Sequence, residues 1–205
     1  MDKFCDGGFN GLDVVDLGVK RYIITGGPGS GKSTLLDALA GEGFPCFREV
    51  SREIIREQQS IGGNLLPWGN LHAFARECYR RMQQQICDSS GFPFAFFDRG
   101  IPDVAACLNC AGLPVPQKLR EGLKWYDTTV FICPPWQEIY VNDPQRPESF
   151  EHSVRLYHHL VLEYTKQGAR LVNLPRGSVA GRAEVVLREL KWMENKQDYS
   201  HWLLQ

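Results

Sequence analysis

The chain has 205 residues, of which 43% are hydrophobic and 23% are charged, and its 23 basic and 24 acidic residues give a formal net charge of −1. This length suits a single globular domain, and the balanced charge argues against a dedicated binder of nucleic acid or of an anionic membrane. Because of this charge balance we expect no nucleic-acid partner. We also expect no membrane span, because no apolar run is long enough to cross a bilayer.

Residues 1–19 are rich in glycine and aspartate, and we expect a loosely structured lead-in there. They lack the apolar core of an export signal. The seven cysteines are an odd number scattered along the chain, which favours reduced thiols over a disulfide framework. Cys107 and Cys110 form one C-x-x-C pair, but without a second pair at zinc-ribbon spacing we expect buried or incidental thiols. Together these features predict a cytoplasmic protein.

From residue 20 to residue 194, short apolar runs alternate with stretches of helical periodicity. Several apolar runs, such as FAFF at 94–97, are continuous, which is typical of strands covered on both faces. The pattern predicts strands near 21–26, 45–50, 93–98, 128–133 and 169–174. It predicts helices near 32–40, 51–59, 70–89, 116–124, 150–167 and 179–194. Such alternation indicates one α/β domain over 20–194, with a parallel sheet flanked by helices, followed by a tail at 195–205.

The segment GGPGSGKS at 26–33 matches the P-loop pattern G-x-x-x-x-G-K-[ST] and lies between a predicted strand and a predicted helix. Glycines in such a loop let successive backbone N–H groups point at an anion, and the start of the helix adds positive potential. We expect Lys32 to neutralise the β and γ phosphate oxygens and the Ser33 hydroxyl to bind Mg²⁺. The expected ligand is ATP, with GTP as the alternative. The predicted nucleotide-binding residues are Gly27, Pro28, Gly29, Ser30, Gly31, Lys32, Ser33 and Thr34.

Charged residues follow the second predicted strand, which we expect to end at Glu49. Ser51 is then placed to cap the next helix, and Arg52 would lie in its first turn, facing the same crevice as Glu49. In a kinase, Glu49 would bind a hydroxyl or ribose and Arg52 would hold an anion. Alternatively, both are solvated charges at the start of a helix.

An aromatic pair comes next along the chain. Pro67 and Trp68 could form a flat wall against a base or ring, so we include Trp68 among the predicted substrate-binding residues. Phe74 follows on a predicted helix, and we expect it in the core because apolar residues at helical spacing usually face inward.

The sequence FAFFDRG at 94–100 places Asp98 at the end of an apolar strand. A carboxylate at that position can hold Mg²⁺ or accept a proton. An ATP-hydrolysing motor usually has an acidic residue next, whereas this chain has Arg99, which suits a second anion or the transferring phosphoryl group. The motif therefore favours transfer to a bound acceptor over transfer to water. The alternative is that Asp98 and Arg99 form a structural ion pair.

Four prolines punctuate the segment 134–149, which contains Arg146. We predict a lid there, with Arg146 closing over the transferring phosphoryl group. The alternative is an ordinary surface arginine. The predicted catalytic residues are Lys32, Asp98, Arg99 and Arg146, and the predicted metal ligands are Ser33 and Asp98.

Seven stretches occur in a characteristic order: GGPGSGKSTLLDAL, EVSREIIREQ, PW, FFDRGIPD, YDTTVFICPPWQEIY, DPQRPESFE and LVNLPRGSVAGRAEVVLREL. Together they resemble the AAA-type P-loop domain family that includes the bacterial NadR ribosylnicotinamide kinase domain. The resemblance covers about 20–194. It implies a P-loop NTPase fold with an adenylate-kinase-like core and sheet order 2-3-1-4-5. It also implies nucleotide binding and, more loosely, small-molecule kinase activity. LPRGSV at 174–179 would then approach the nucleotide base.

The leading hypothesis is a Mg²⁺-dependent, ATP-using kinase acting on a small nucleoside- or nucleotide-like hydroxyl acceptor. The rival hypothesis is a nucleoside-triphosphate hydrolase or switch that binds a protein or lipid partner. A nucleotide-dependent scaffold without turnover is a third possibility, which the pairing of Asp98 with Arg99 disfavours.

Overall fold

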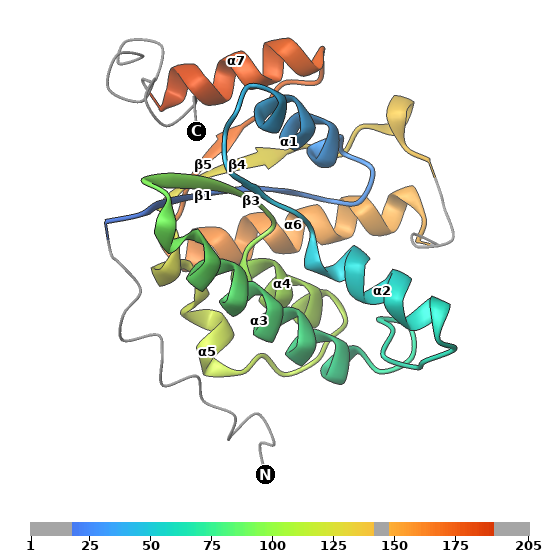
Figure 1. The fold of residues 1–205 in the computed structure, drawn as a ribbon. Helices are drawn as coiled ribbons and strands as arrows, with labels where there is room; N and C mark the ends of the chain where they lie inside the picture. The colour runs from blue at the N-terminus through green and yellow to red at the C-terminus, as the bar shows by residue number, and fades with distance from the viewer. Residues whose placement is uncertain (1–17, 142–147, 191–205) are drawn as a thin grey trace.

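The computed structural model describes residues 18–141 and 148–190, so Arg146 and the tail at 195–205 lie outside the described residues, as does nearly all of the predicted lead-in (Figure 1). The strands are β1 Lys20–Gly26, β2 Cys46–Phe47, β3 Phe94–Asp98, β4 Thr129–Cys133 and β5 Arg170–Asn173. The α-helices are α1 Lys32–Gly41, α2 Val50–Ser60, α3 Leu71–Asp88, α4 Ile101–Cys110, α5 Gln117–Arg120, α6 Phe150–Lys166 and α7 Val179–Glu189. Short 3₁₀ turns lie at Ser89–Gly91, Gly122–Trp125 and Gln137–Ile139.

The five strands form one sheet in the order β2-β3-β1-β4-β5, and every neighbouring pair is parallel. This confirms the predicted fold class and strand order. β1 lies at the centre, where Ile24 is in register with Asp98 of β3 and Gly26 with Cys133 of β4. The loop after β1 therefore emerges beside Asp98, at the carboxyl edge of the sheet, where open α/β sheets bind ligands.

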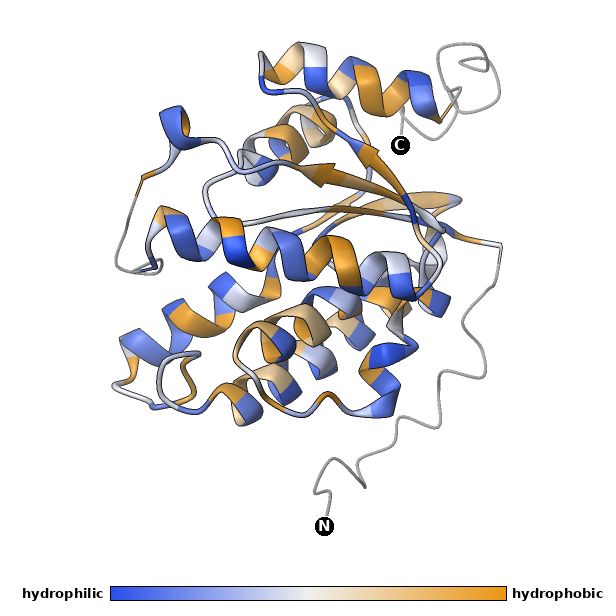
Figure 2. Ribbon diagram, turned by 180° about the vertical axis from the view of Figure 1, so that it is seen from behind, coloured by the Kyte–Doolittle hydropathy of each residue, from blue (hydrophilic) through white to orange (hydrophobic). Residues whose placement is uncertain are grey.

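Helices cover both faces of the sheet: α1 and α7 lie on one side, and α2 to α6 lie on the other (Figure 1). The sheet has a hydrophobic core on each face, and successive residues of β1 pack into opposite cores. Ile23 packs with α3, α4 and α6, whereas Ile24 packs with α1 and α7. In β3, Phe97 lies in the same core as Ile23, and Phe96 lies in the same core as Ile24. Figure 2 shows the strands as mainly hydrophobic ribbons between helices of mixed colour. Burial on both faces explains why these strands are continuous apolar runs in the sequence.

The helix α4 was not predicted. Its residues are buried on nearly every side, from Ile101 to Leu108, so it lacks the one-sided apolar pattern by which helices are recognised. Its signal is local: Pro102 lies in the first turn, and Asp103 accepts a hydrogen bond from the N–H of Gly100 at 3.1 Å. Such an arrangement is a helix start.

Two predicted elements are shorter than expected. The strand expected at 45–50 is only Cys46–Phe47, so Glu49 is the residue that precedes α2 rather than the end of a strand. Ser51 does not cap this helix, because its hydroxyl donates to Glu49 at 2.5 Å. The helix expected at 116–124 divides into α5 and a 3₁₀ turn at Gly122. A Cβ at Gly122 would come within 2.3 Å of Ile101 Cγ2, so this tight turn against α4 requires glycine.

Within the described residues, none of the helices has both the length and the apolar character needed to cross a membrane.

Candidate active site

The P-loop joins β1 to α1 and is held closed by its own side chains. Ser30 Oγ and Lys32 Nζ both donate to the carbonyl of Gly27, at 2.9 and 3.0 Å. Gly29 and Gly31 have φ angles of 73° and 77°, in the left-handed region that favours glycine. Gly31 begins α1 without a side-chain cap, and the first turn contains no acidic residue. The positive end of α1 is therefore available to a phosphate.

Arg182 of α7 braces the same loop from outside. Its guanidinium is buried and donates to the carbonyls of Ser30 and Gly31, both at 3.2 Å, and to Cys133 Sγ at 2.6 Å. These hydrogen bonds attach the P-loop backbone to α7 and so fix its conformation. Arg182 was not among the predicted site residues, because nothing in its helical surroundings marks it as more than a surface cation.

Lys32 is buried beneath the loop and is 4% exposed. Burial and the neighbouring Arg99 cation lower the pKa of its ammonium, while the carboxylates of Asp98 and Glu49 act in the opposite direction. Two cations thus converge below the P-loop, which suits the charge density of a triphosphate.

Ser33 and Asp98 lie together, at the start of α1 and the end of β3. Ser33 Oγ donates to Asp98 Oδ2 at 3.2 Å, while the buried Oδ1 of Asp98 has no hydrogen-bond partner among the described residues. Burial, followed by the charge of Glu49, raises the pKa of Asp98 to about 6. A hydroxyl and an unsatisfied carboxylate oxygen are ligands that Mg²⁺ prefers, so the two residues fit the predicted metal site. Within the described residues, no group of three or more acidic, histidine or cysteine side chains could hold a metal, so phosphate oxygens would complete the shell.

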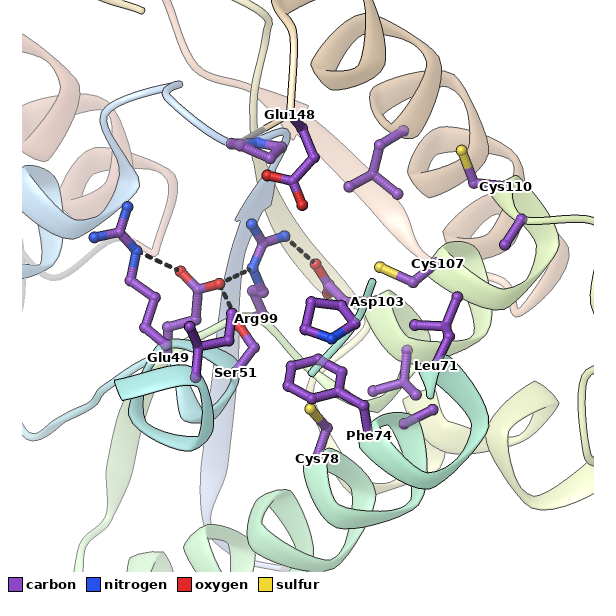
Figure 3. Close-up of a pocket in the computed structure, with 18 of the residues that line it drawn as sticks. Glu49, Ser51, Leu71, Phe74, Cys78, Arg99, Asp103, Cys107, Cys110 and Glu148 are labelled. Carbon is purple, nitrogen blue, oxygen red and sulfur yellow. Dashed lines mark hydrogen bonds and ion pairs between the residues drawn. The ribbon is translucent and has the colours of Figure 1, made fainter. Parts of the chain in front are cut away.

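Arg99 is held in place by three oxygen acceptors. Its Nε donates to Glu49 Oε1 at 2.8 Å and its Nη1 to Asp103 Oδ1 at 3.1 Å (Figure 3). Nη1 also donates to the carbonyl of Gly26 at 3.1 Å. Arg99 pairs with Glu49 and Asp103 rather than with Asp98, its expected partner in the ion-pair alternative. Its φ of 73° is the only positive value at a non-glycine position in the described part of the chain. Backbone in such a region costs about 1–3 kcal/mol and often accompanies a functional site.

Glu49 is the anionic centre of this cluster. It accepts from Ser51 and Arg99, and Arg52 Nε lies 3.8 Å from its other oxygen. Burial opposes ionisation of Glu49, but the charges of Arg99 and Lys32 outweigh burial and hold its pKa at about 2. Glu49 is therefore an anion at neutral pH, and the guanidinium of Arg52 lies beside it.

Asp103 anchors Arg99 to the rest of the fold. Its carboxylate accepts hydrogen bonds from Thr25 of β1 and Tyr164 of α6, in addition to those from Arg99 and the N–H of Gly100. Asp103 was not predicted as a site residue, because the helix that carries it was missed.

A cavity of ≈ 280 Å³ opens beside the P-loop, between α2, α3, α4 and α6. Glu49, Arg99 and Asp103 line one end, and Phe74 and Cys78 of α3 line another wall (Figure 3). Of the predicted substrate-binding residues, Glu49, Arg52 and Trp68 all line it, and Trp68 is 50% exposed. Phe74 is buried in the core, as expected, but it also lines the cavity. Thr34 has an exposed side chain.

Comparison with protein-family models gives a match to an AAA domain over residues 21–182. Comparison with solved structures gives two matches to deoxyadenosine kinase from M. mycoides. The one with the products dCMP and a flexible dCDP bound has a TM-score of 0.61 and 13% identity, covering 83% of this chain and 98% of the kinase. The one with dATP bound has a TM-score of 0.49 and 12% identity, covering 83% and 99%. The comparison with curated protein sequences found no match.

Proposed function

The chain belongs to the AAA domain family of P-loop proteins, and from this premise we propose that it is an ATP-dependent, Mg²⁺-requiring kinase for a small hydroxyl-bearing acceptor. A nucleoside-like acceptor was expected from the sequence, and the cavity of ≈ 280 Å³ has room for a molecule of about that size. The fold shared with deoxyadenosine kinase is compatible with this activity.

One observation carries the proposal: the cavity beside the P-loop has an ionised carboxylate at the end nearest the phosphate site. Glu49 lines the cavity, and Arg99 holds it at 2.8 Å. A hydrolase needs to place only a water molecule, whereas a cavity walled by four helices has room for an organic acceptor. The kinase is therefore favoured over the hydrolase or switch.

Each residue has a distinct part in the proposed transfer. Lys32 and the P-loop backbone hold the phosphate chain of ATP, and Arg182 fixes the loop. Ser33 and Asp98 would hold Mg²⁺, which would neutralise phosphate charge. Glu49 accepts a hydrogen bond from the acceptor hydroxyl and takes its proton as the bond between the acceptor oxygen and the γ-phosphorus forms and the bond between that phosphorus and the leaving oxygen of ADP breaks. Positioning matters most here, because the transition state of phosphoryl transfer is loose.

The test is to measure phosphate release from ATP with Mg²⁺, alone and with a panel of hydroxyl compounds. We expect slow basal hydrolysis and a large increase in ATP consumption, with a phosphorylated product, when an acceptor is present. Glu49→Gln should reduce transfer by roughly 100-fold while leaving the Kd for ATP nearly unchanged, in line with the loss of a positioned acid–base group. Glu42→Gln, which changes an exposed glutamate, is the matched control. Fast hydrolysis that responds to no compound and is indifferent to Glu49→Gln would establish the hydrolase instead.

A further inference from the structure

The cavity beside the P-loop is chemically divided, and the division bears on what the acceptor is. Its charged lining residues, together with His152, lie at the starts of α2, α4 and α6, near the phosphate site: Glu49, Arg52, Arg99, Asp103 and Glu148. The wall formed by α3 and the later part of α4 is different in kind. It consists of Leu71, Phe74, Ala75, Cys78, Met82, Val104, Cys107, Cys110 and Ala111.

The apolar wall has few hydrogen-bonding groups to offer a ligand. Most backbone N–H and C=O groups of α3 and α4 are bonded inside their helices, so recognition of a ligand there depends mainly on side chains. Among the described residues that line the cavity there is no asparagine or glutamine. The thiols are weak donors, and burial raises the pKa of Cys107 to about 12, so this side chain stays neutral.

Asp103, the carboxylate nearest this wall on α4, is already occupied. Thr25 and Arg99 donate to its Oδ1, and Gly100 and Tyr164 donate to its Oδ2. Donors and acceptors of a ligand placed against the α3–α4 wall would lose their hydrogen bonds to water and form none with the protein. That loss weakens the binding of such a ligand by roughly tenfold or more, because a buried donor or acceptor without a partner keeps its desolvation cost.

We infer that the acceptor is an amphiphile: a hydroxyl-bearing polar head that lies at Glu49 and Arg99, joined to a neutral, apolar ring or chain that packs against Phe74, Met82 and Cys107. This inference rests on the proposed kinase function and narrows it. It excludes a nucleobase with its several edge donors and acceptors as the group held by the α3–α4 wall.

Matched ribosides test the inference by calorimetry, with a non-hydrolysable ATP analogue and Mg²⁺ present. The probe is a C-riboside in which a phenyl ring replaces the base, compared with uridine, cytidine and adenosine. The phenyl riboside should bind at least roughly tenfold more tightly than any of the three nucleosides, the effect of leaving one or more polar groups unpaired. A nucleoside that binds as tightly as the phenyl riboside, or a phenyl riboside that does not bind, overturns the inference.

Variants of Met82, which is 2% exposed, provide a second readout. Met82→Gln adds a carboxamide of nearly the same shape to the apolar wall. It should reduce the ratio of the nucleoside Kd to the phenyl riboside Kd by roughly tenfold. Met82→Leu, the volume-conserving control, should keep the wild-type preference. An unchanged preference in folded Met82→Gln overturns the inference. Because these are binding measurements, they are independent of the hydrolysis assay that decides between kinase and hydrolase.

Discussion

Charged side chains of both signs are buried together at the site, and each depends on the others. Lys32, Asp98, Arg99 and Asp103 are at most 8% exposed, and they balance as two cations and two anions. Removing one partner of a buried ion pair leaves an uncompensated charge, which typically costs about 3–5 kcal/mol. Folding should therefore be checked for every variant of these residues.

Lys32→Ala should weaken ATP binding by roughly tenfold or more, because charge-assisted contacts with phosphate are the strong ones. Calorimetric titration with ATP and Mg²⁺ measures the change. Lys20→Ala is the control, since the Lys20 side chain is 64% exposed and lies on β1 away from the loop. An unchanged Kd in Lys32→Ala would contradict the assignment of the phosphate site.

Asp98→Asn should leave ATP binding largely intact while reducing turnover and shifting its Mg²⁺ dependence to higher concentration. The amide cannot supply the unsatisfied anionic oxygen that Oδ1 now provides beside Ser33. Turnover measured against Mg²⁺ concentration gives the shift, with Asp88→Asn, at the exposed end of α3, as control. Identical Mg²⁺ curves for wild type and Asp98→Asn would rule out Asp98 as a metal ligand.

The thiol of Cys107 should resist alkylation at pH 7–9. Burial raises its pKa to about 12, so the reactive thiolate is scarce throughout this range. Both Cys87 and Cys107 are partly exposed, so the raised pKa of Cys107 should decide the order: mass spectrometry after N-ethylmaleimide treatment should show labelling of Cys87 before Cys107, and equal labelling in denaturant. Labelling of Cys107 as fast as Cys87 in the folded protein would contradict the raised pKa.

At the scale of elements, the site depends on how each helix begins. The segments that follow β1, β2 and β3 supply Ser33, Glu49 and Arg99, and all three strands end at the same edge of the sheet. The P-loop could be predicted because its backbone geometry requires glycine at fixed spacing. Asp103 could not be predicted, because its role comes from a helix whose all-round burial conceals it in the sequence.

The helix α7 contributes Arg182, and removal of this side chain should make the P-loop less ordered, because two hydrogen bonds to its carbonyls are lost. Arg182→Ala is expected to raise the KM for ATP by roughly tenfold with a smaller effect on kcat, since the loop would have to be ordered by the nucleotide itself. Arg182→Lys should recover part of the loss by donating to one of the two carbonyls. Steady-state kinetics measure both, with Arg188→Ala on the exposed face of α7 as control. A fall in melting temperature with an unchanged KM would show that Arg182 serves stability alone.

At the scale of the whole molecule, the family resemblance implied the strand order, and the apolar pattern predicted every long helix except α4. Edge elements were less predictable: β2 has only two residues, Cys46 and Phe47, and pairs on one side with β3. Such a short strand has no pattern of its own, and its position follows from the neighbouring strand. The cavity walls could not be predicted either, because they bring together residues from four helices that are distant in sequence.

Binding of ATP at the P-loop should stabilise the entire domain, because only the folded chain has the loop. At a concentration about 100-fold above Kd, ligand binding adds about 2.7 kcal/mol to the free energy of unfolding. For a chain of this size, the melting temperature should rise by roughly 5–10 °C. Differential scanning fluorimetry with ATP and Mg²⁺ measures the rise, which Lys32→Ala should largely abolish. An equal rise in Lys32→Ala would place the nucleotide elsewhere.

The central position of β1 also has a consequence for how the protein is made. Lys20 of β1 pairs with Phe94 of β3, and Gly26 pairs with Cys133 of β4, so a ribosome releases the central strand long before either neighbour exists. During that interval the apolar side chains of Tyr22, Ile23 and Ile24 have no sheet to join, and such segments are prone to aggregate. Closing these distant pairings is slow. We therefore expect nascent chains truncated before residue 94 to need chaperone protection, and full-length chains to become protease-resistant only after β4 has emerged.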